Sequence, residues 1–142
     1  MLNMPLEDMQ RLVIDALEDA KAQDIKVFDT TGLTSLFDRV IIASGTSNRQ
    51  TRSLARSVFD AVREKKLDVL SVEGEDTGEW VVLDLADIVV HCMQPAIRQY
   101  YNLEAIWGEK PVEVELLPQS RIIPPINQGF DPVQPYSASD ED

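Results

Sequence analysis

The stretch Gly78–Met93, "GEWVVLDLADIVVHCM", decides the fold, because it holds two short apolar runs on either side of Asp-Leu-Ala-Asp. Side chains alternate along a β-strand, so residues two apart share a face. We predict a hairpin in which Leu85 and Ala86 form a two-residue loop. The pairs that follow from this loop are Asp84 with Asp87, Val82 with Val89, and Trp80 with His91.

The two faces of this hairpin differ in chemistry. One face is apolar throughout and belongs in a core; its residues are Val81, Leu83, Ile88, Val90 and Cys92. The other face joins an aromatic-imidazole end, at Trp80 and His91, to an acidic end at Asp84 and Asp87. Opposed carboxylates destabilise a sheet by an amount on the order of 0.2–1 kcal/mol. A functional role and a plain turn role therefore both stay open for each aspartate.

Composition restricts the class of protein. The chain has 142 residues, enough for one domain, and a net charge of −12. A single cysteine excludes an internal disulfide, which fits a reducing compartment, and one cysteine with one histidine cannot form a Cys/His zinc site. Because Cys92 falls on the core face of the hairpin, we expect it to be a buried apolar side chain. Nucleic-acid phosphates repel an acidic chain, which favours a basic protein partner. The N-terminal residues lack a signal-peptide pattern and no apolar run has the length of a membrane span, so we expect a cytoplasmic protein.

Segments with helical and strand periodicity follow one another along the chain. Apolar residues at three- and four-residue steps predict helices, and short β-branched runs predict strands. The predicted elements are a helix over 4–23, strands over 25–29 and 38–44, a helix over 48–66, a strand over 67–72, the hairpin, and a short helix from Pro95. This order predicts the α/β (α+β) class, with a mixed β-sheet flanked by helices.

The composition changes after Gly108. Six of the eight prolines lie beyond Lys110, and the chain ends in Ser-Ala-Ser-Asp-Glu-Asp. We predict one domain over residues 1–108 and a Pro-rich acidic tail over residues 109–142 that is largely disordered. Residues 112–117 alternate in polarity, which allows an additional edge strand.

The glycine turn "SGTSNRQT" allows two interpretations. A turn before a helix N-terminus attracts anions, and Gly45–Ser47 with Asp84 and Asp87 would suit a nucleotidyltransferase-like, phosphate-handling enzyme. The alternative is a capping box, in which Ser47 caps the helix and Gln50 reaches back. We favour the capping box, because it needs no ligand and because the carboxylates lack an Asp-x-Asp spacing. The segment also lacks the second glycine and the lysine of a Walker A loop.

The predicted helix over 48–66 carries six of the thirteen basic residues. Arg49, Arg52, Arg56 and Arg63 fall near one face of it, at steps of three, four and seven. Such a stripe is usually a solvated face that pairs with nearby carboxylates. It also suits an accessory contact with RNA phosphates at the edge of a larger complex, so both roles stay open.

Three segments together resemble the Iojap-related ribosomal silencing factor family: "FDRVIIASGTSNRQT", "GEWVVLDLADIVVHCM" and "RQYYNLEAIWG". The resemblance runs in order over roughly residues 5–108. It implies a nucleotidyltransferase-like α/β fold without transferase activity, so no catalytic residue, metal or cofactor is expected.

The resemblance also implies a function. Members of the family bind the large ribosomal subunit through ribosomal protein number fourteen of the L series, a small basic protein on the intersubunit face, and so block joining of the small subunit. Translation is thereby repressed, notably under nutrient limitation, and members also accompany large-subunit maturation. Members can self-associate, so a homodimer is a further expectation. A generic acidic adaptor that dimerises through the hairpin is the remaining alternative.

The resemblance places five residues in the stretch that meets the ribosomal protein, namely Trp80, Val81, Val82, Leu83 and Asp84. The hairpin geometry adds Asp87 and His91 as neighbours on the same face. An aromatic anchor with carboxylates beside it suits a basic partner. Val81 and Leu83 fall on the predicted core face, which weakens their case as contacts.

Tyr100 and Tyr101 follow in the predicted helix from Pro95. They would extend the docking surface if their rings were exposed. We favour packing within the helix layer for this pair, because apolar residues flank it at helical spacing.

Overall fold

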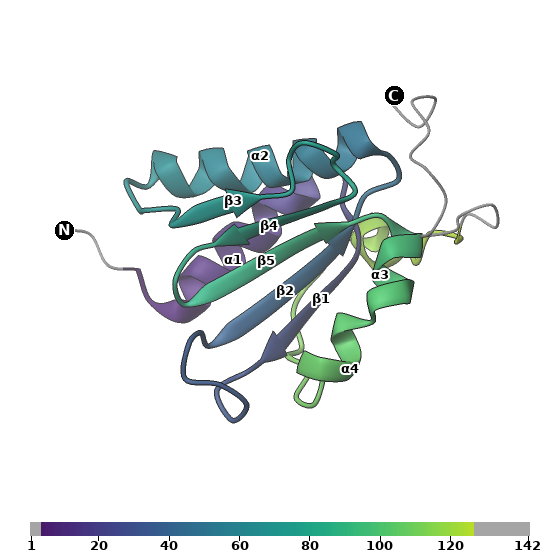
Figure 1. Ribbon diagram of the computed structural model, residues 1–142. Helices are drawn as coiled ribbons and strands as arrows, with labels where there is room; N and C mark the ends of the chain where they lie inside the picture. The colour runs from purple at the N-terminus through teal and green to yellow at the C-terminus, as the bar shows by residue number, and fades with distance from the viewer. Residues whose placement is uncertain (1–3, 127–142) are drawn as a thin grey trace.

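The computed structural model describes residues 4–126, which form a five-stranded β-sheet with helices on both faces (Figure 1). The helices are α1 (Leu6–Asp19), α2 (Asn48–Glu64), α3 (Pro95–Tyr101), α4 (Leu103–Trp107) and the 3-10 helix η1 (Pro118–Arg121). The strands are β1 (Gln23–Asp29), β2 (Arg39–Ser44), β3 (Ser71–Glu73), β4 (Trp80–Asp84) and β5 (Ile88–Met93).

The sheet is mixed and has the strand order β1-β2-β5-β4-β3. β2 and β5 are parallel, whereas the other neighbouring pairs are antiparallel. Figure 1 shows α1 and α2 together on one face of the sheet, and α3 and α4 on the other. This arrangement confirms the predicted α+β class, and the order of elements agrees with the one predicted.

A large apolar core fills the space between the sheet and the helices α1 and α2. Val81, Leu83, Val90 and Cys92 enter it from the hairpin and are fully buried, as the alternation of the sequence predicted. Burial raises the pKa of the Cys92 thiol to about 12, so this side chain is an inert apolar group. Each fully buried aliphatic side chain stabilises the fold by about 1.5–3 kcal/mol.

A smaller core lies on the opposite face of the sheet, beneath α3 and α4. Its buried residues are Phe28, Val40, Ile42, Met93, Ile97 and Leu103. Trp80 and Trp107 pack against the margin of this core and stay partly exposed. Because α3 and α4 are short, they cover β1 and β2 and leave the outer part of the hairpin uncovered.

The hairpin forms as predicted, but the pairing of its strands is shifted by two residues. The loop consists of Ala86 and Asp87, and the observed pairs include Trp80–Met93, Val82–His91 and Asp84–Val89. The predicted pairs are therefore wrong, although every strand side chain keeps its predicted face because the shift is even. The cause is Leu85, which is buried and whose N–H donates to the Ile88 carbonyl at 2.9 Å. A loop centred on Leu85 would expose this side chain to water.

The N-terminus of α2 carries the predicted serine cap. The Ser47 hydroxyl accepts a hydrogen bond from the Gln50 N–H at 3.0 Å. The Gln50 side chain reaches one residue further back than a capping box requires, because its Oε1 accepts from the Thr46 N–H at 2.7 Å. Its Nε2 donates to the Lys21 carbonyl at 3.1 Å, which ties this turn to the end of α1.

Two elements differ in extent from the prediction. The strand predicted over 67–72 is confined to β3, and Leu67 and Val69 pack against the large core without continuing the strand. The last helix is divided into α3 and α4. The division occurs at Asn102, which adopts a left-handed conformation with a φ of 50°.

Residues 109–126, called the strap below, run along β1. An antiparallel contact between Phe28 and Pro111 places the strap beside this strand. The Asp29 N–H donates to the Lys110 carbonyl at 2.8 Å. The strap therefore covers the outer edge of β1, which lies at one end of the sheet.

The strap is also attached to α1. The buried carboxylate of Glu18 accepts the Leu117 N–H at 2.7 Å. Alternate strap residues pack against the large core, and they are Val112, Val114 and Leu116. Residues 112–117 thus alternate as predicted without forming a strand. The domain boundary at residue 108 stays a prediction, and residues 127–142 of the predicted disordered tail lie outside the described residues.

Candidate protein-docking face

The uncovered side of the β4–β5 hairpin is the candidate site. We call it the hairpin face and define it by five partly exposed side chains, namely Trp80, Val82, Asp84, Val89 and His91. Val82 lies directly opposite His91, and Asp84 lies directly opposite Val89. The face combines an aromatic end, an apolar middle and a carboxylate, and aromatic side chains are enriched in protein interfaces.

A hydrogen bond holds the aromatic end of the hairpin face. The Trp80 indole Nε1–H donates to Nδ1 of His91 at 3.0 Å. This bond requires an unprotonated Nδ1, so the imidazole proton lies on Nε2. Burial lowers the pKa of His91 to about 4, which leaves the ring neutral at pH 7. The two residues are diagonal neighbours and not the directly opposed pair that was predicted.

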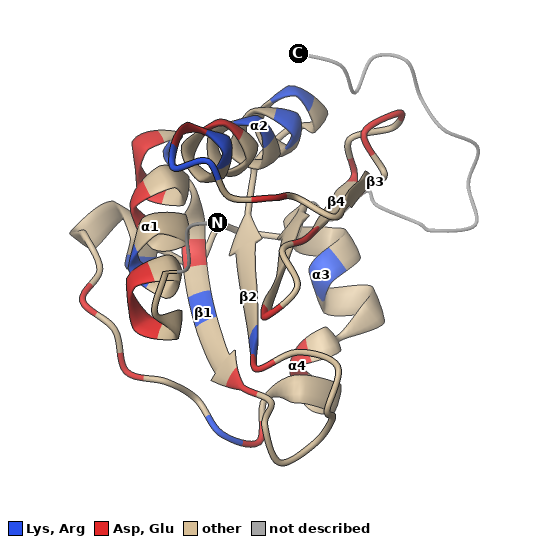
Figure 2. Ribbon diagram, turned by 90° about the vertical axis from the view of Figure 1, so that its left-hand side faces the viewer, with Lys and Arg blue, Asp and Glu red and all other residues tan. Residues whose placement is uncertain are grey.

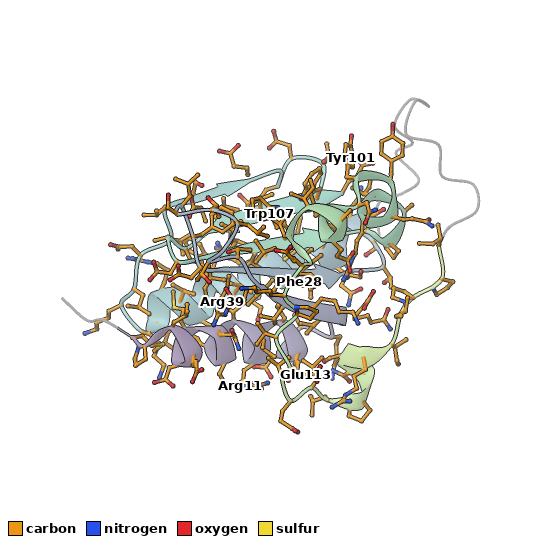
Figure 3. The ribbon with its side chains drawn as sticks, turned by 90° about the horizontal axis from the view of Figure 1, so that it is seen from below. Arg11, Phe28, Arg39, Tyr101, Trp107 and Glu113 are labelled. Carbon is orange, nitrogen blue, oxygen red and sulfur yellow. The ribbon has the colours of Figure 1, made fainter. Side chains whose placement is uncertain are left out.

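Two tyrosines of α3 lie beside the hairpin face. The ring centroid of Tyr101 lies 5.0 Å from that of Trp80, and the Tyr100 centroid lies 4.9 Å from that of Tyr101. Tyr100 and Tyr101 are 59% and 49% exposed, so the expectation that they pack within the helix layer is wrong. Figure 3 shows Tyr101 and Arg11 of α1 on opposite sides of the sheet. The tyrosines therefore extend the surface on the side of the hairpin face.

Two of the predicted contact residues do not reach the surface. Val81 and Leu83 are fully buried in the large core. Their place in the predicted contact set is corrected, because they support the hairpin face from below and cannot touch a partner. Every second residue of a strand points to the other face, so the prediction of a continuous run of contacts included two core residues.

The two hairpin aspartates have different surroundings. Asp84 lies on the hairpin face, and its Oδ1 accepts the Ala86 N–H at 2.9 Å, which is the hydrogen bond of a turn aspartate. Asp87 is exposed in the loop and borders a small cavity on the α1 side of the sheet. The prediction that Asp87 faces Asp84 is therefore wrong, because the strand partner of Asp84 is Val89.

Acidic and basic side chains occupy different elements around the hairpin face. Figure 2 shows acidic residues in the segment that connects β3 and β4, and basic residues on α2. This segment immediately precedes Trp80 and carries Glu75, Asp76 and Glu79; with Glu73, the last residue of β3, they form an acidic segment over residues 73–79. A negatively charged loop thus leads directly into β4, the strand that carries Trp80.

The arginines of α2 differ in their contacts with neighbouring side chains and backbone groups. Arg56 Nε lies 3.7 Å from Asp60 Oδ1, and the guanidinium also lies over the Phe59 ring. Arg52 donates to the Glu75 carbonyl at 3.4 Å, which brings the N-terminal part of α2 against the acidic loop. Arg49 is exposed one turn earlier. The expected pairing with carboxylates therefore holds for Arg56, and Arg52 contacts the loop that leads into β4.

The family model described as ribosomal silencing factor during starvation matches residues 3–132. The chain belongs to the ribosomal silencing factor family. The chain is 50% identical to ribosomal silencing factor RsfS of Chromobacterium violaceum over 109 residues, which make up 76% of this chain and 89% of that protein. It is 35% identical to RsfS of Bacillus subtilis over 109 residues, or 77% and 92% of the two chains. A crystal structure of a Chromobacterium violaceum protein, 49% identical, matches with a TM-score of 0.73 and covers 77% of this chain and 92% of that one.

Ribosomal silencing factors are ribosome-binding regulators of translation and not enzymes. In the structure, the glycine turn Gly45–Ser47 also lies far from Asp84 and Asp87, the carboxylates that the nucleotidyltransferase-like alternative requires. Gly45 donates to the Met93 carbonyl at one end of β5, whereas Asp87 precedes the other end. A strand of this length spans about 16 Å, so Gly45–Ser47 cannot act together with the hairpin aspartates. Within residues 4–126, no group of three or more His, Cys, Asp or Glu side chains is arranged to hold a metal ion.

One residue that the sequence analysis did not single out organises this side of the ribosomal silencing factor. Arg98 of α3 is only 5% exposed, and its Nη2 lies 3.1 Å from Oε2 of Glu104 in α4. Its Nη1 donates to the Ser44 hydroxyl at 2.8 Å and to the Asp24 carbonyl at 2.7 Å. Arg98 thereby joins α3 to α4 and to β1 and β2. The available signal was an arginine beside apolar residues in "PAIRQYY".

Proposed function

We propose that this chain binds the large ribosomal subunit through ribosomal protein number fourteen of the L series, on the intersubunit face. The observation that carries the proposal is Trp80, an aromatic side chain held by His91 on a sheet face that α3 and α4 leave uncovered. Aromatic anchors are typical centres of protein interfaces. The carboxylate of Asp84 beside this anchor favours a small basic partner.

The proposed mechanism is steric exclusion. A protein seated on the intersubunit face occupies surface that the small subunit needs, so subunit joining is blocked and translation is repressed. Occupancy alone produces this effect, and the mechanism requires no cofactor. The family's description refers to starvation, which supports repression under nutrient limitation. We propose a cytoplasmic site of action, where ribosomes are assembled; among the described residues, no helix is long and apolar enough to cross a membrane.

The proposed contact residues are not the continuous run 80–84, because only alternate residues of β4 reach the surface. It consists of the hairpin-face residues Trp80, Val82, Asp84 and His91, with Val89 between them and Asp87 at the rim. Val81 and Leu83 are excluded by their burial. Substitutions at these two positions would act on folding and not on the contact itself.

Co-sedimentation with isolated large subunits tests the proposal. Wild type should bind and should reduce joining when small subunits are added, whereas Trp80→Ala and Asp84→Arg should lose both effects. Asp84→Asn is the matched control for the turn, because the asparagine side chain retains an oxygen that accepts the Ala86 N–H. Binding that is indifferent to both Trp80→Ala and Asp84→Arg would move the docking surface away from the hairpin face.

A minor contact with ribosomal RNA is also proposed, through Arg49 and Arg52 with Arg56 further along α2. Arg52 contacts the loop that precedes Trp80, so these side chains would lie at the border of a complex formed on the hairpin face. Removing one phosphate contact should reduce the salt dependence of binding by about one unit of slope. Arg49→Ala with an unchanged salt dependence would show that this residue does not contact RNA.

Two further expectations concern assembly. A homodimer that uses the hairpin face would compete with the ribosome, so Trp80→Ala should shift a concentration-dependent dimer toward monomer in analytical ultracentrifugation. A dimer that persists in this variant would use another surface.

A role in large-subunit maturation predicts that cells lacking the protein accumulate large-subunit precursors in sucrose gradients.

A further inference from the structure

Three aromatic rings form a continuous row at the edge of the hairpin face. The rings of Trp80 and Tyr101 are 5.0 Å apart with an interplanar angle of 43°, and those of Tyr101 and Tyr100 are 4.9 Å apart at 85°. The row joins β4 to α3, so it exists only in the folded protein. Helix α3 buries Ala96, Ile97 and Arg98 and turns its two tyrosines outward.

The rings are held from behind before any partner arrives. His91 accepts the indole N–H of Trp80, and Arg98 fixes α3 through Glu104 and the Ser44 hydroxyl. Side chains that are already ordered lose little conformational freedom on binding. The row is therefore preorganised, although Tyr100 and Tyr101 are about half exposed.

The electrostatic surroundings of the row favour a cation. The acidic segment over residues 73–79 precedes Trp80, and Asp84 follows it on the same strand face. The guanidinium of Arg98 faces inward and is paired with Glu104, and Arg52 offsets only part of the charge of the acidic segment, where it donates to the Glu75 carbonyl. The faces of indole and phenol rings carry negative charge density and attract ammonium and guanidinium groups. An anionic ligand would be repelled by the neighbouring carboxylates.

We propose that this row of rings receives a lysine or arginine side chain of the partner protein in a cation–π contact. The inference rests on the proposed function and specifies how the hairpin face recognises a basic partner: the ring faces bind the charged group directly. The competing interpretation is an apolar contact, in which the rings would serve only as hydrophobic surface.

A peptide titration of the full-length protein tests the charge requirement without the ribosome. The probe is a blocked Gly-Arg-Gly tripeptide, and its neutral counterpart carries citrulline, which has nearly the same shape. The Trp80 indole N–H is the NMR reporter, and Trp107→Phe assigns the two indole signals of the chain. The arginine peptide should shift the Trp80 signal more than that of Trp107, and the citrulline peptide should leave both in place. An unmoved Trp80 signal, or an equal response to both peptides, would overturn the inference.

A pair of substitutions tests the requirement for a ring face. Tyr101→Phe keeps the aromatic face, whereas Tyr101→Leu keeps apolar bulk without it. With large subunits as the partner, Tyr101→Leu should bind roughly three- to ten-fold more weakly than Tyr101→Phe. Ile106→Ala, at an exposed position of α4, should match wild type. Equal affinity of the two Tyr101 variants would contradict cation–π recognition, whereas wild type that ignores large subunits but responds to the arginine peptide would contradict only the proposed partner.

Discussion

His91 is the only histidine of the chain, and its burial makes stability depend on pH. Its pKa is lowered to about 4 in the folded protein, whereas an unfolded histidine titrates near 6.5. Between these values the unfolded state binds a proton that the folded state excludes. The free energy of unfolding therefore has its full value above pH 6.5 and falls as the pH decreases toward 4.

The consequence can be measured with one substitution. Between pH 7 and pH 5, we expect His91 to remove about 2 kcal/mol from the free energy of unfolding of wild type. His91→Gln does not titrate and keeps a hydrogen-bond acceptor near Trp80, so its stability should fall less over the same interval. Urea titrations followed by circular dichroism at the two pH values give the difference. Equal losses in both proteins would contradict a lowered histidine pKa.

Gly45 is required by close packing at the N-terminus of α2. An added Cβ would lie 2.9 Å from Oγ1 of Thr51 and 3.0 Å from its backbone nitrogen, whereas a Cβ at Gly32 would meet only the flexible Lys110 Nζ at 3.6 Å. Gly45→Ala should lower the free energy of unfolding by about 1–3 kcal/mol. Gly32→Ala should change it by less than about 0.5 kcal/mol. Denaturant midpoints measure both, and a fully tolerated Gly45→Ala would require another reason for this glycine.

The faces of the hairpin residues were predictable, but their pairing was not. The pleat of a strand enforces alternation, so the burial of Val81 and Leu83 follows from the pattern alone. The loop lacked a signal, because Ala86 adopts a φ of 77°, a left-handed conformation that glycine usually supplies. The exposure of Tyr101 depends on how α3 is seated by Arg98, which is a tertiary contact that no local pattern contains.

Among the helices and strands, those with strong periodicity were predicted most closely. The helix predicted over 48–66 is observed as Asn48–Glu64, and the strand predicted over 38–44 as Arg39–Ser44. The strap could not be placed from its sequence. Its course is set by Glu18 and by the edge of β1, and few hydrogen bonds join its own residues.

A truncation series measures what the strap contributes. A variant that ends at Gly108 loses the packing of three half-buried aliphatic side chains, so its free energy of unfolding should fall by about 2 kcal/mol or more. A variant that ends at Ile126 keeps every described contact and should match the full chain to within about 0.5 kcal/mol. Thermal and urea unfolding of both variants provide the comparison. Full stability of the shorter variant would support residues 1–108 as an independent domain.

The molecule as a whole carries a net charge of −12. The effect of a charge on the hairpin face must therefore be distinguished from the effect of the total charge on association. Asp84→Arg and Asp19→Arg raise the net charge equally, but Asp84 lies on the hairpin face and Asp19 is exposed at the end of α1, on the other side of the sheet. Association with large subunits at low salt should slow about ten-fold for Asp84→Arg and stay within about two-fold of wild type for Asp19→Arg. Stopped-flow measurements give both rates. Equal slowing would indicate that total charge governs the encounter.

The central position of β5 in the sheet has a consequence for how rarely this part of the protein unfolds locally. β2 and β4 flank this strand, and its residues Ile88, Val90 and Cys92 are fully buried. Backbone amides in such a strand exchange with solvent only when most of the molecule unfolds. His91 belongs to β5, and the Trp80 indole that it holds belongs to the neighbouring strand β4, so we expect the proposed docking anchor to rest on a slowly exchanging part of the sheet. A partner that docks there would therefore meet a single persistent shape, and we expect discrimination between partners to depend on fit to that shape and not on folding during the encounter.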